Sequence, residues 1–390
     1  MTIAQAQSST VRVLFCIPSL SGGGAEKIAA QVATHLDQSR FNVTLFAHDR
    51  AGRFVGSFEN GVRLVYASDK PYTRWRLPLL LLKTANLVWN SDIVVGANEG
   101  RATVLSFLCA AAFRKKFVSW IHCDWSEFGK YTSWRARLGL RVSAWGDAVV
   151  AVSAGAGAAF RRLVQVNRHK LITIPNGIET EKTRRLAHQE VTAEHLELFR
   201  SPTIVAVGRL CEQKNHQLLI RTHAAIMRSG VFHRLLILGE GHLLGHLRAL
   251  AAELGVPDTV HFLGFKSNPY PYMRHAAVFA LTSLFEGAGI VLIEAMATGA
   301  PTVAVDCPSG PAEVLGGGRF GVLVPRHDDA KLRDALVAVL TNPQYRSNLS
   351  RLALEGAARF DLGQTIASWE ELLLRLFSGQ SPVPLVHEQG

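Results

Sequence analysis

One stretch, Thr282–Val305, limits more than any other what this chain can fold into. It reads T-S-L-F-E-G-A-G-I-V-L-I-E-A-M-A-T-G-A-P-T-V-A-V and follows the apolar run 278–281. A loop of small residues, 287–289, precedes an apolar helix that starts near Ile290 and stops at Gly299, shortly before a proline. Glycine and proline commonly mark helix ends. The stretch therefore predicts a strand, a loop, a helix and a second strand.

Two glutamates flank the predicted helix start. A helix N-terminus behind glycines presents backbone N–H groups and the positive end of the helix dipole, which suit a phosphate. Glu286 precedes the glycine loop, and Glu294 lies among apolar neighbours, where a carboxylate needs a partner or a ligand. Because carboxylates repel phosphate but accept hydrogen bonds from hydroxyls, the pattern favours a phosphorylated sugar. A structural βα unit, with Glu286 as a helix-terminal charge and Glu294 in a salt bridge, explains this stretch equally well.

The same alternation of apolar runs, glycine turns and amphipathic segments extends along the chain. Strands that alternate with helices form parallel sheets, and 390 residues with 48% hydrophobic residues can bury two cores of ordinary size. The predicted strands are 11–17, 43–46, 62–66, 93–95, 117–121 and 148–152 in the first half, and 203–208, 235–238, 260–264 and 278–281 in the second.

Cationic and glycine residues follow two predicted strands of the second half. Arg209 and Lys214 lie in G-R-L-C-E-Q-K just after the strand at 203–208, and Gly239 opens G-E-G after the strand at 235–238. An arginine fork and a lysine point charge at one strand end can both reach a diphosphate. Alone the two cations are a weak indication, but together with the glutamate pair they are a strong one.

These motifs resemble those of the retaining glycosyltransferases of family 4. E-G-A-G-I-V-L-I-E-A-M-A-T-G-A-P matches the family's E-x7-E motif, G-R-L-C-E-Q-K resembles its G-R-L-x-x-x-K motif, and Asn176-Gly177-Ile178 resembles its linker between domains. The resemblance covers nearly the whole chain. It implies the α/β GT-B fold, in which two Rossmann-like doubly wound domains face a cleft and a C-terminal helix crosses back to the first domain.

The domain boundaries follow from that resemblance. We expect an N-terminal acceptor-binding domain at 1–175, completed by the C-terminal helix 362–378. A nucleotide-sugar donor-binding domain is expected at 176–361, and a flexible tail at 379–390. The last helix carries apolar residues at helical spacing, namely Ile366, Trp369, Leu372, Leu373 and Leu376.

The resemblance also implies the site residues. Expected catalytic residues are Glu286 and His122, which hold hydroxyls of the donor sugar, and the leaving-group cations Arg209 and Lys214. Glu294 is expected to bind the ribose. The expected donor-binding set is Gly23, Gly24, Arg209, Lys214, Gly239, Glu286, Gly287, Ala288, Gly289, Ile290 and Glu294. The family has a His-Asp or His-x-Asp-like element at His122, and the intervening Cys123 leaves the role of Asp124 open.

We expect neither a metal nor a cofactor. The chain has no D-x-D sequence, and two cations with a helix dipole already oppose a diphosphate charge. The five cysteines are far apart without C-x-x-C, so the chain predicts no zinc site and no disulfide framework and fits a reducing cytosol. It shows no signal-like start, and its longest uncharged apolar stretch, 102–113, is too short to cross a bilayer.

The net charge of +11 lies in the first half of the chain. Residues 1–175 hold 22 Lys and Arg against 10 Asp and Glu, which is +12, and residues 176–390 hold 20 against 21, which is −1. Basic residues mix with Trp or Leu at Arg74–Lys83 and Lys130–Trp145, as in interfacial segments, and Arg114–Lys116 adds a third basic run. The segment Lys130–Trp145 predicts an apolar stripe formed by Trp134, Leu138, Val142 and Trp145.

This charge distribution indicates an anionic partner of the first half. The chain has no zinc-finger, RNA-recognition or helix-turn-helix signature, so we expect an anionic membrane surface and no nucleic acid. The expected location is the cytoplasm, in peripheral contact with the inner face of the cytoplasmic membrane.

The expected function is transfer, with retention, of a hexosyl or N-acetylhexosaminyl group in bacterial surface polysaccharide synthesis. The resemblance favours a UDP-sugar donor and a glycan or polyprenyl-linked acceptor. Alternatives that stay open are a GDP-mannose-dependent mannosyltransferase, a GT-B synthase or phosphorylase with a soluble acceptor, and a non-catalytic nucleotide-sugar sensor. A nicotinamide oxidoreductase would explain the glycine loop at 22–24 but leaves the second-half cations and glutamates without a role.

Overall fold

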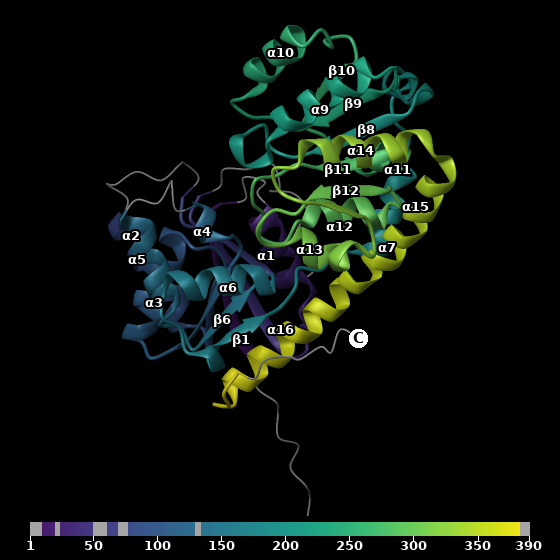
Figure 1. Ribbon diagram of the computed structural model, residues 1–390. Helices are drawn as coiled ribbons and strands as arrows, with labels where there is room; N and C mark the ends of the chain where they lie inside the picture. The colour runs from purple at the N-terminus through teal and green to yellow at the C-terminus, as the bar shows by residue number, and fades with distance from the viewer. Residues whose placement is uncertain (1–9, 20–23, 50–60, 69–76, 129–133, 383–390) are drawn as a thin grey trace, which may run out of the picture. The chain divides into compact units, whose positions relative to one another are not determined.

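The computed structural model describes residues 10–19, 24–49, 61–68, 77–128 and 134–382 (Figure 1). The chain divides into two compact units. The first unit comprises residues 1–176 and 363–390, and the second comprises residues 177–362. Within the described residues each unit contains one sheet, and all strand pairs in both sheets are parallel.

The first unit is built on a seven-stranded sheet with the order β3-β2-β1-β4-β5-β6-β7. Its strands are β1 (Val11–Ile17), β2 (Phe41–Ala47), β3 (Arg63–Tyr66), β4 (Ile93–Gly96), β5 (Lys116–Ile121), β6 (Ala148–Ala151) and β7 (Leu171–Thr173). In the register, Val13 of β1 lies opposite Val43 on one side and Ile93 on the other. For β7 the sequence indicates a strand end at Ile174-Pro175, before the turn at Asn176-Gly177, and the structure places that strand at Leu171–Thr173.

Helices cover both faces of this sheet. They are α1 (Gly24–His35), α2 (Leu77–Trp89), α3 (Arg101–Ala112), α4 (Trp125–Phe128), α5 (Trp134–Ser143), α6 (Ala154–Leu163) and α16 (Leu362–Phe377). Alternate residues of β1 point to opposite faces. Leu14 packs with Leu80 of α2 and Leu105 of α3, whereas Phe15 meets Trp369 of α16 at a ring-centroid distance of 6.1 Å. The last helix therefore supplies part of the first unit's core.

The second unit has a six-stranded sheet with the order β10-β9-β8-β11-β12-β13. Its strands are β8 (Thr203–Val207), β9 (Arg234–Leu238), β10 (Val260–Gly264), β11 (Val278–Leu281), β12 (Thr302–Val305) and β13 (Val322–Val324). Its α-helices are α7 (Thr180–Ala187), α8 (Ala193–Leu196), α9 (His216–Arg228), α10 (Leu244–Glu253), α11 (Tyr270–His275), α12 (Ile290–Ala297), α13 (Pro311–Val314), α14 (Asp329–Thr341) and α15 (Pro343–Ala357). Two separate clusters of apolar residues show that α9, α10 and α14 cover one face, and α11, α12 and α15 the other.

In both sheets the strand order reverses beside the first strand. In the first unit β1 lies between β2 and β4, and in the second β8 lies between β9 and β11. Open parallel sheets bind ligands outside the carboxyl ends of their strands at such a reversal. The predicted α/β class with two doubly wound, Rossmann-like domains is confirmed by this topology.

Among the described residues, no helix combines the length and the apolar character that a membrane crossing requires.

Candidate active site

A buried ion pair lies where the strand order of the second sheet reverses. Lys214 follows β8 and Glu286 follows β11, and the Lys214 Nζ lies 2.6 Å from the Glu286 Oε1. The two side chains are 14% and 8% exposed. Ser283 Oγ donates a hydrogen bond of 2.6 Å to the same carboxylate oxygen. Two predicted catalytic residues, 72 positions apart, therefore meet because β8 and β11 are neighbours.

Arg209 lies exposed beside this pair and is held by Gln213, which the sequence motifs do not single out. Its Nη2 donates to Gln213 Oε1 at 3.2 Å, and Gln213 Nε2 donates to the Phe285 carbonyl at 3.1 Å. The Gln213 carbonyl also accepts from the Leu284 N–H at 2.8 Å. Gln213 thus connects the loop after β8 to the loop that carries Glu286. One loop therefore presents an arginine fork and a lysine point charge, both of which suit the oxygens of a diphosphate.

The start of α12 adds the positive end of a helix dipole to the site. Gly289 is its N-cap with φ 63°, in the left-handed region that favours glycine. No side chain caps this end, and the first turn carries no acidic residue, so its N–H groups suit an anion. The predicted donor-binding residues here are buried at Gly287, Ala288 and Gly289 and half-buried at Ile290.

Glu294, inside α12, has a hydrogen-bond donor that the sequence did not reveal. The Tyr270 hydroxyl, at the start of α11, donates to Glu294 Oε1 at 2.9 Å, and both residues are buried. The Tyr270 N–H is in turn held by Asn268 Oδ1 at 3.2 Å. These contacts give the Glu294 carboxylate a defined orientation next to the loop that follows β10.

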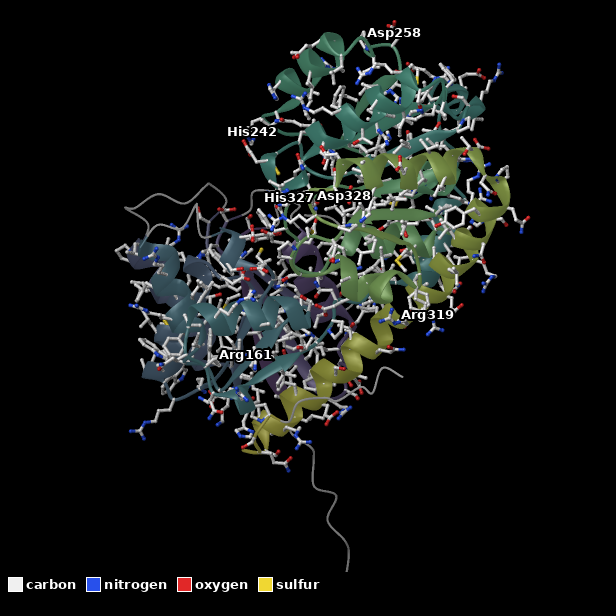
Figure 2. The ribbon with its side chains drawn as sticks, viewed as in Figure 1. Arg161, His242, Asp258, Arg319, His327 and Asp328 are labelled. Carbon is white, nitrogen blue, oxygen red and sulfur yellow. The ribbon has the colours of Figure 1, made fainter. Side chains whose placement is uncertain are left out.

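The glycine turn after β9 packs closely on the cationic loop. Gly239 has φ 142°, and a Cβ atom there would lie 1.9 Å from the Gly208 carbonyl oxygen, so only glycine fits. Just beyond this turn, His242 (labelled in Figure 2) contacts the loop after β8, with its Nε2 3.0 Å from Glu212 Oε1. Gly239, a predicted donor-binding residue, therefore brings the loop after β9 against the loop after β8. Its own backbone lies beside Arg209.

The charges of the buried pair also affect its neighbours. Burial and then the nearby Glu286 carboxylate raise the pKa of the Cys307 thiol, which follows β12. Burial and then the nearby Lys214 lower the pKa of His216 to about 4. The surroundings of the ion pair are therefore poorly solvated, and both neighbours are uncharged near neutral pH. Within the described ranges, no group of three or more His, Cys, Asp or Glu residues could hold a metal ion.

In the first unit, His122 directly follows β5 and is 8% exposed. Burial lowers its pKa to about 3, and a hydrogen bond with the Ala97 backbone opposes this shift. Its Nε2 is buried without a partner among the described residues. The imidazole is therefore neutral and can exchange a hydrogen bond with a ligand hydroxyl.

Asp124 has a structural role at the start of α4. Its Oδ1 accepts from the Ser126 N–H at 2.9 Å and from Ser126 Oγ at 2.5 Å, and the residue is 1% exposed. This pattern is that of a helix cap. The first predicted glycine loop is only partly described: Gly24 is the exposed first residue of α1, and Gly23 lies outside the described residues.

Two family models together match most of the chain, between residues 22 and 355. The model described as "Glycosyltransferase Family 4" matches residues 22–182, and the one described as "Glycosyl transferases group 1" matches residues 189–355. The chain belongs to glycosyltransferase family 4. It is therefore a transferase by class, as its motifs predict, and the second matched segment contains the ion pair, Arg209 and Glu294.

Curated relatives of this glycosyltransferase include bacterial enzymes. The N-acetylgalactosamine-N,N'-diacetylbacillosaminyl-diphospho-undecaprenol 4-alpha-N-acetylgalactosaminyltransferase of Campylobacter jejuni is 36% identical over 186 residues, which cover 48% of this chain and 48% of that protein. The amylovoran biosynthesis glycosyltransferase AmsD of Erwinia amylovora is 24% identical over 370 residues, which cover 93% and 99%. The chain spans about half the length of the first curated relatives that it matches.

The glycosyltransferase also resembles solved structures over most of its length. Anabaena Alr3699/HepE, solved in complex with UDP and glucose, has a TM-score of 0.79 and 20% identity, and the match covers 93% of this chain and 99% of that one. This likeness confirms the expected GT-B fold.

Proposed function

We propose that this glycosyltransferase transfers a hexosyl or N-acetylhexosaminyl group, with retention, from a UDP-sugar to a glycan or polyprenyl-linked acceptor in bacterial surface polysaccharide synthesis. The observation that carries the proposal is the buried Lys214–Glu286 pair beside Arg209 and the uncapped start of α12. This arrangement combines positive groups that can stabilise an anionic leaving group with a carboxylate that can accept hydrogen bonds from sugar hydroxyls. The names of the relatives support the choice of donor, acceptor and pathway.

In the proposed reaction, the bond between the sugar's anomeric carbon and the diphosphate oxygen breaks. The acceptor hydroxyl oxygen forms the new bond to that carbon, and its proton passes to the leaving diphosphate. Negative charge grows on the diphosphate in the transition state, where Arg209, Lys214 and the N–H groups of α12 stabilise it. Because these positive groups suffice for the charge, the proposed mechanism uses no metal ion.

The remaining groups of the site hold hydroxyls. Glu286 accepts from hydroxyls of the transferred sugar, and Glu294 accepts from the ribose. His122 contributes a hydrogen bond to the same sugar as a neutral imidazole, since burial lowers its pKa to about 3. Interactions with the transferred sugar change during the reaction and raise kcat, whereas the ribose contact is the same before and during it.

A nucleotide-sugar panel in thermal-shift measurements tests this proposal. UDP-sugars at 100 times their Kd are expected to stabilise the protein by about 2.7 kcal/mol. Arg209→Ala should abolish the shift, whereas Arg248→Ala, at an exposed arginine of α10, serves as the matched control and should retain it. Transfer of a labelled sugar to a polyprenyl-diphosphate-linked glycan then tests the acceptor.

Other results of the same experiments favour the alternatives. A shift with GDP-mannose and none with UDP-sugars indicates a mannosyltransferase. Transfer to a soluble sugar or sugar phosphate indicates a soluble-acceptor synthase, and binding without turnover on any acceptor indicates a sensor. A shift with NADH and no nucleotide-sugar overturns the proposed activity.

We also propose that the acceptor is met at an anionic membrane surface. In the first unit, α2 contacts α3 and α3 contacts α5 (Figure 1), and none of the three helices contains Asp or Glu. We call this layer the α2–α3–α5 face. It exposes large apolar side chains, and exposed apolar patches mark interaction sites. The most exposed are Leu82 (69%), Trp89 (62%) and Leu108 (54%), and Trp145 (62%) lies two residues beyond the end of α5.

Basic residues accompany these apolar side chains. Lys83, Arg114, Arg137 and Arg141 are all exposed on or next to the α2–α3–α5 face. Each such residue near an anionic bilayer is worth about 1 kcal/mol, which falls with salt. Four such basic residues, together with the exposed apolar side chains, support reversible binding of the protein to an anionic bilayer.

The predicted apolar stripe of α5 is only partly correct. Leu138 and Trp145 are exposed, but Val142 is 3% exposed. The side chain of Trp134, and the residues Arg74 and Arg76, lie outside the described part of the chain.

Co-sedimentation with lipid vesicles tests the membrane proposal. We expect binding to vesicles that contain phosphatidylglycerol, weak binding to phosphatidylcholine alone, and weakening by salt. Arg114→Glu with Arg141→Glu should abolish it, and Leu82→Gln with Trp89→Gln should weaken it. Phe232→Gln, at an exposed aromatic residue of the second unit, is the matched control. Equal binding to both vesicle types, or none, contradicts the proposal.

A further inference from the structure

One buried carboxylate of the first unit takes no part in the chemistry described so far. Glu99 follows β4, is 5% exposed, and has a pKa raised by burial. Among the described residues, no Lys, Arg or His forms an ion pair with it. A buried carboxylate without a cation is costly unless it is hydrogen-bonded, so its presence requires an explanation.

The contacts of Glu99 provide one. Its Oε1 accepts from the N–H groups of both His122 and Cys123, the latter at 3.1 Å. These N–H groups belong to the residues immediately after β5, which is the sheet neighbour of β4. A single carboxylate therefore clamps the loop of one strand to the loop of the next. The clamp lies beside the reversal of strand order, where parallel sheets bind ligands.

The clamp determines where the His122 ring lies. The ring packs on Trp120 at a centroid distance of 4.7 Å, and its Nε2 is buried without a partner among the described residues. A buried polar nitrogen without a hydrogen-bond partner is rare, and it indicates that a bound molecule supplies the partner. With the backbone on both sides of its Cα held, His122 has little freedom to turn this nitrogen away.

We propose that Glu99 is the positioning residue of His122: its carboxylate holds the His122–Cys123 backbone so that Nε2 is presented to a hydroxyl of the donor sugar. This inference rests on the proposed function, in which His122 contacts that sugar. If Glu99 had a purely structural role, its removal would change stability alone. If Glu99 positions His122, its removal lowers kcat, and it does so only while the His122 side chain is present.

A double-mutant cycle tests this inference on the full-length protein. Glu99→Ala is expected to lower kcat about 10–100-fold, by analogy with loss of a group that orients a metal-bound histidine, and to leave the Kd for UDP within about twofold. In a His122→Ala background the same substitution should change kcat by less than about twofold, because residues that act through one another are not additive. Glu99→Gln, whose amide oxygen can accept the same two N–H groups, should restore most of kcat.

Asp92→Ala is the matched control. Asp92 precedes β4, at the opposite end of that strand, and pairs with the exposed Arg12 at 2.6 Å. Its removal should affect thermal stability and leave kcat unchanged. If Glu99→Ala does not fold, Glu99→Gln and Glu99→Asp carry the test, since the shorter aspartate should fail to reach the two N–H groups and lose kcat.

The outcomes separate the inference from the function on which it rests. Unchanged kcat in Glu99→Ala, or equal kcat losses in the presence and absence of the His122 side chain, overturns the role of Glu99 alone. Wild-type protein that does not bind UDP overturns the proposed function and this inference with it.

Discussion

Replacing Lys214 with alanine is expected to destabilise the second unit strongly. The Nζ–Oε1 distance to Glu286 is 2.6 Å, and the two side chains are 14% and 8% exposed. At an effective dielectric constant of about 20, the attraction at this distance is about 6 kcal/mol. Desolvation offsets part of it in the intact pair. Removal of the lysine leaves Glu286 buried without its cation, which costs about 3–5 kcal/mol.

Thermal unfolding followed by circular dichroism measures this loss. At about 2–4 °C per kcal/mol for a domain of this size, the melting temperature should fall by roughly 6–20 °C. Arg209→Ala is the matched control, because that side chain is exposed and its removal should change stability by no more than about 0.5 kcal/mol. Both variants lose a cation that faces the leaving group, so each should lose about 2–4 kcal/mol of transition-state stabilisation.

A double variant separates the two effects. Lys214→Met with Glu286→Gln removes both charges and leaves none buried alone, so it should recover most of the stability and remain inactive. A melting temperature of Lys214→Ala equal to that of Arg209→Ala would refute the reasoning about the buried pair. Unchanged turnover in both single variants would refute the assignment of the two cations to the diphosphate.

Four further predictions concern the other groups. Glu294→Gln should raise the donor KM more than it lowers kcat, whereas Glu286→Gln should lower kcat at saturating donor; identical effects in steady-state kinetics would show that the roles are wrongly divided. Tyr270→Phe should weaken UDP binding in calorimetry but leave the binding of 2′,3′-dideoxy-UDP unchanged, because it acts through Glu294. Chelator should leave activity intact, and a complete loss that magnesium or manganese restores would contradict the metal-free mechanism. Burial lowers the pKa of His223 to about 3, so its contribution to stability is complete above about pH 6.5 and is lost as the pH falls toward 3; melting temperatures over this range should fall more steeply for wild type than for His223→Gln.

Much of the second unit's site could be predicted because its motifs are local. The glycine loop, α12 and the two glutamates occupy one short segment, and strand, loop and helix patterns are readable at that distance. The structure places Ile290–Ala297 as the helix and brings Lys214 to Glu286. Their meeting depends on the adjacency of β8 and β11, and no local pattern in the sequence determines strand order.

Three of the four residues that the motifs do not single out, Gln213, Tyr270 and Glu99, contact partners that lie far away along the chain, whereas Ser283 lies three positions from Glu286. Gln213, Ser283, Tyr270 and Glu99 are ordinary polar residues in sequence, and each becomes meaningful only through the atom that it contacts. Tyr270 is 24 residues from Glu294, and Glu99 is 23 from His122. Two signals could have drawn attention to them: Glu99 lies just beyond a predicted strand, and Tyr270 follows the loop after another.

The place of α16 in the first unit has a consequence for biosynthesis. Trp369 is fully buried between Phe15 and Trp120, at ring-centroid distances of 6.1 and 4.4 Å. The second unit is one continuous segment, so it can close as soon as it leaves the ribosome. The first unit is synthesised first, yet its core stays incomplete until residues near 376 emerge. A nascent chain that ends before α16 should therefore carry a folded second unit behind an unfinished first one, which reverses the usual N-terminal-first order.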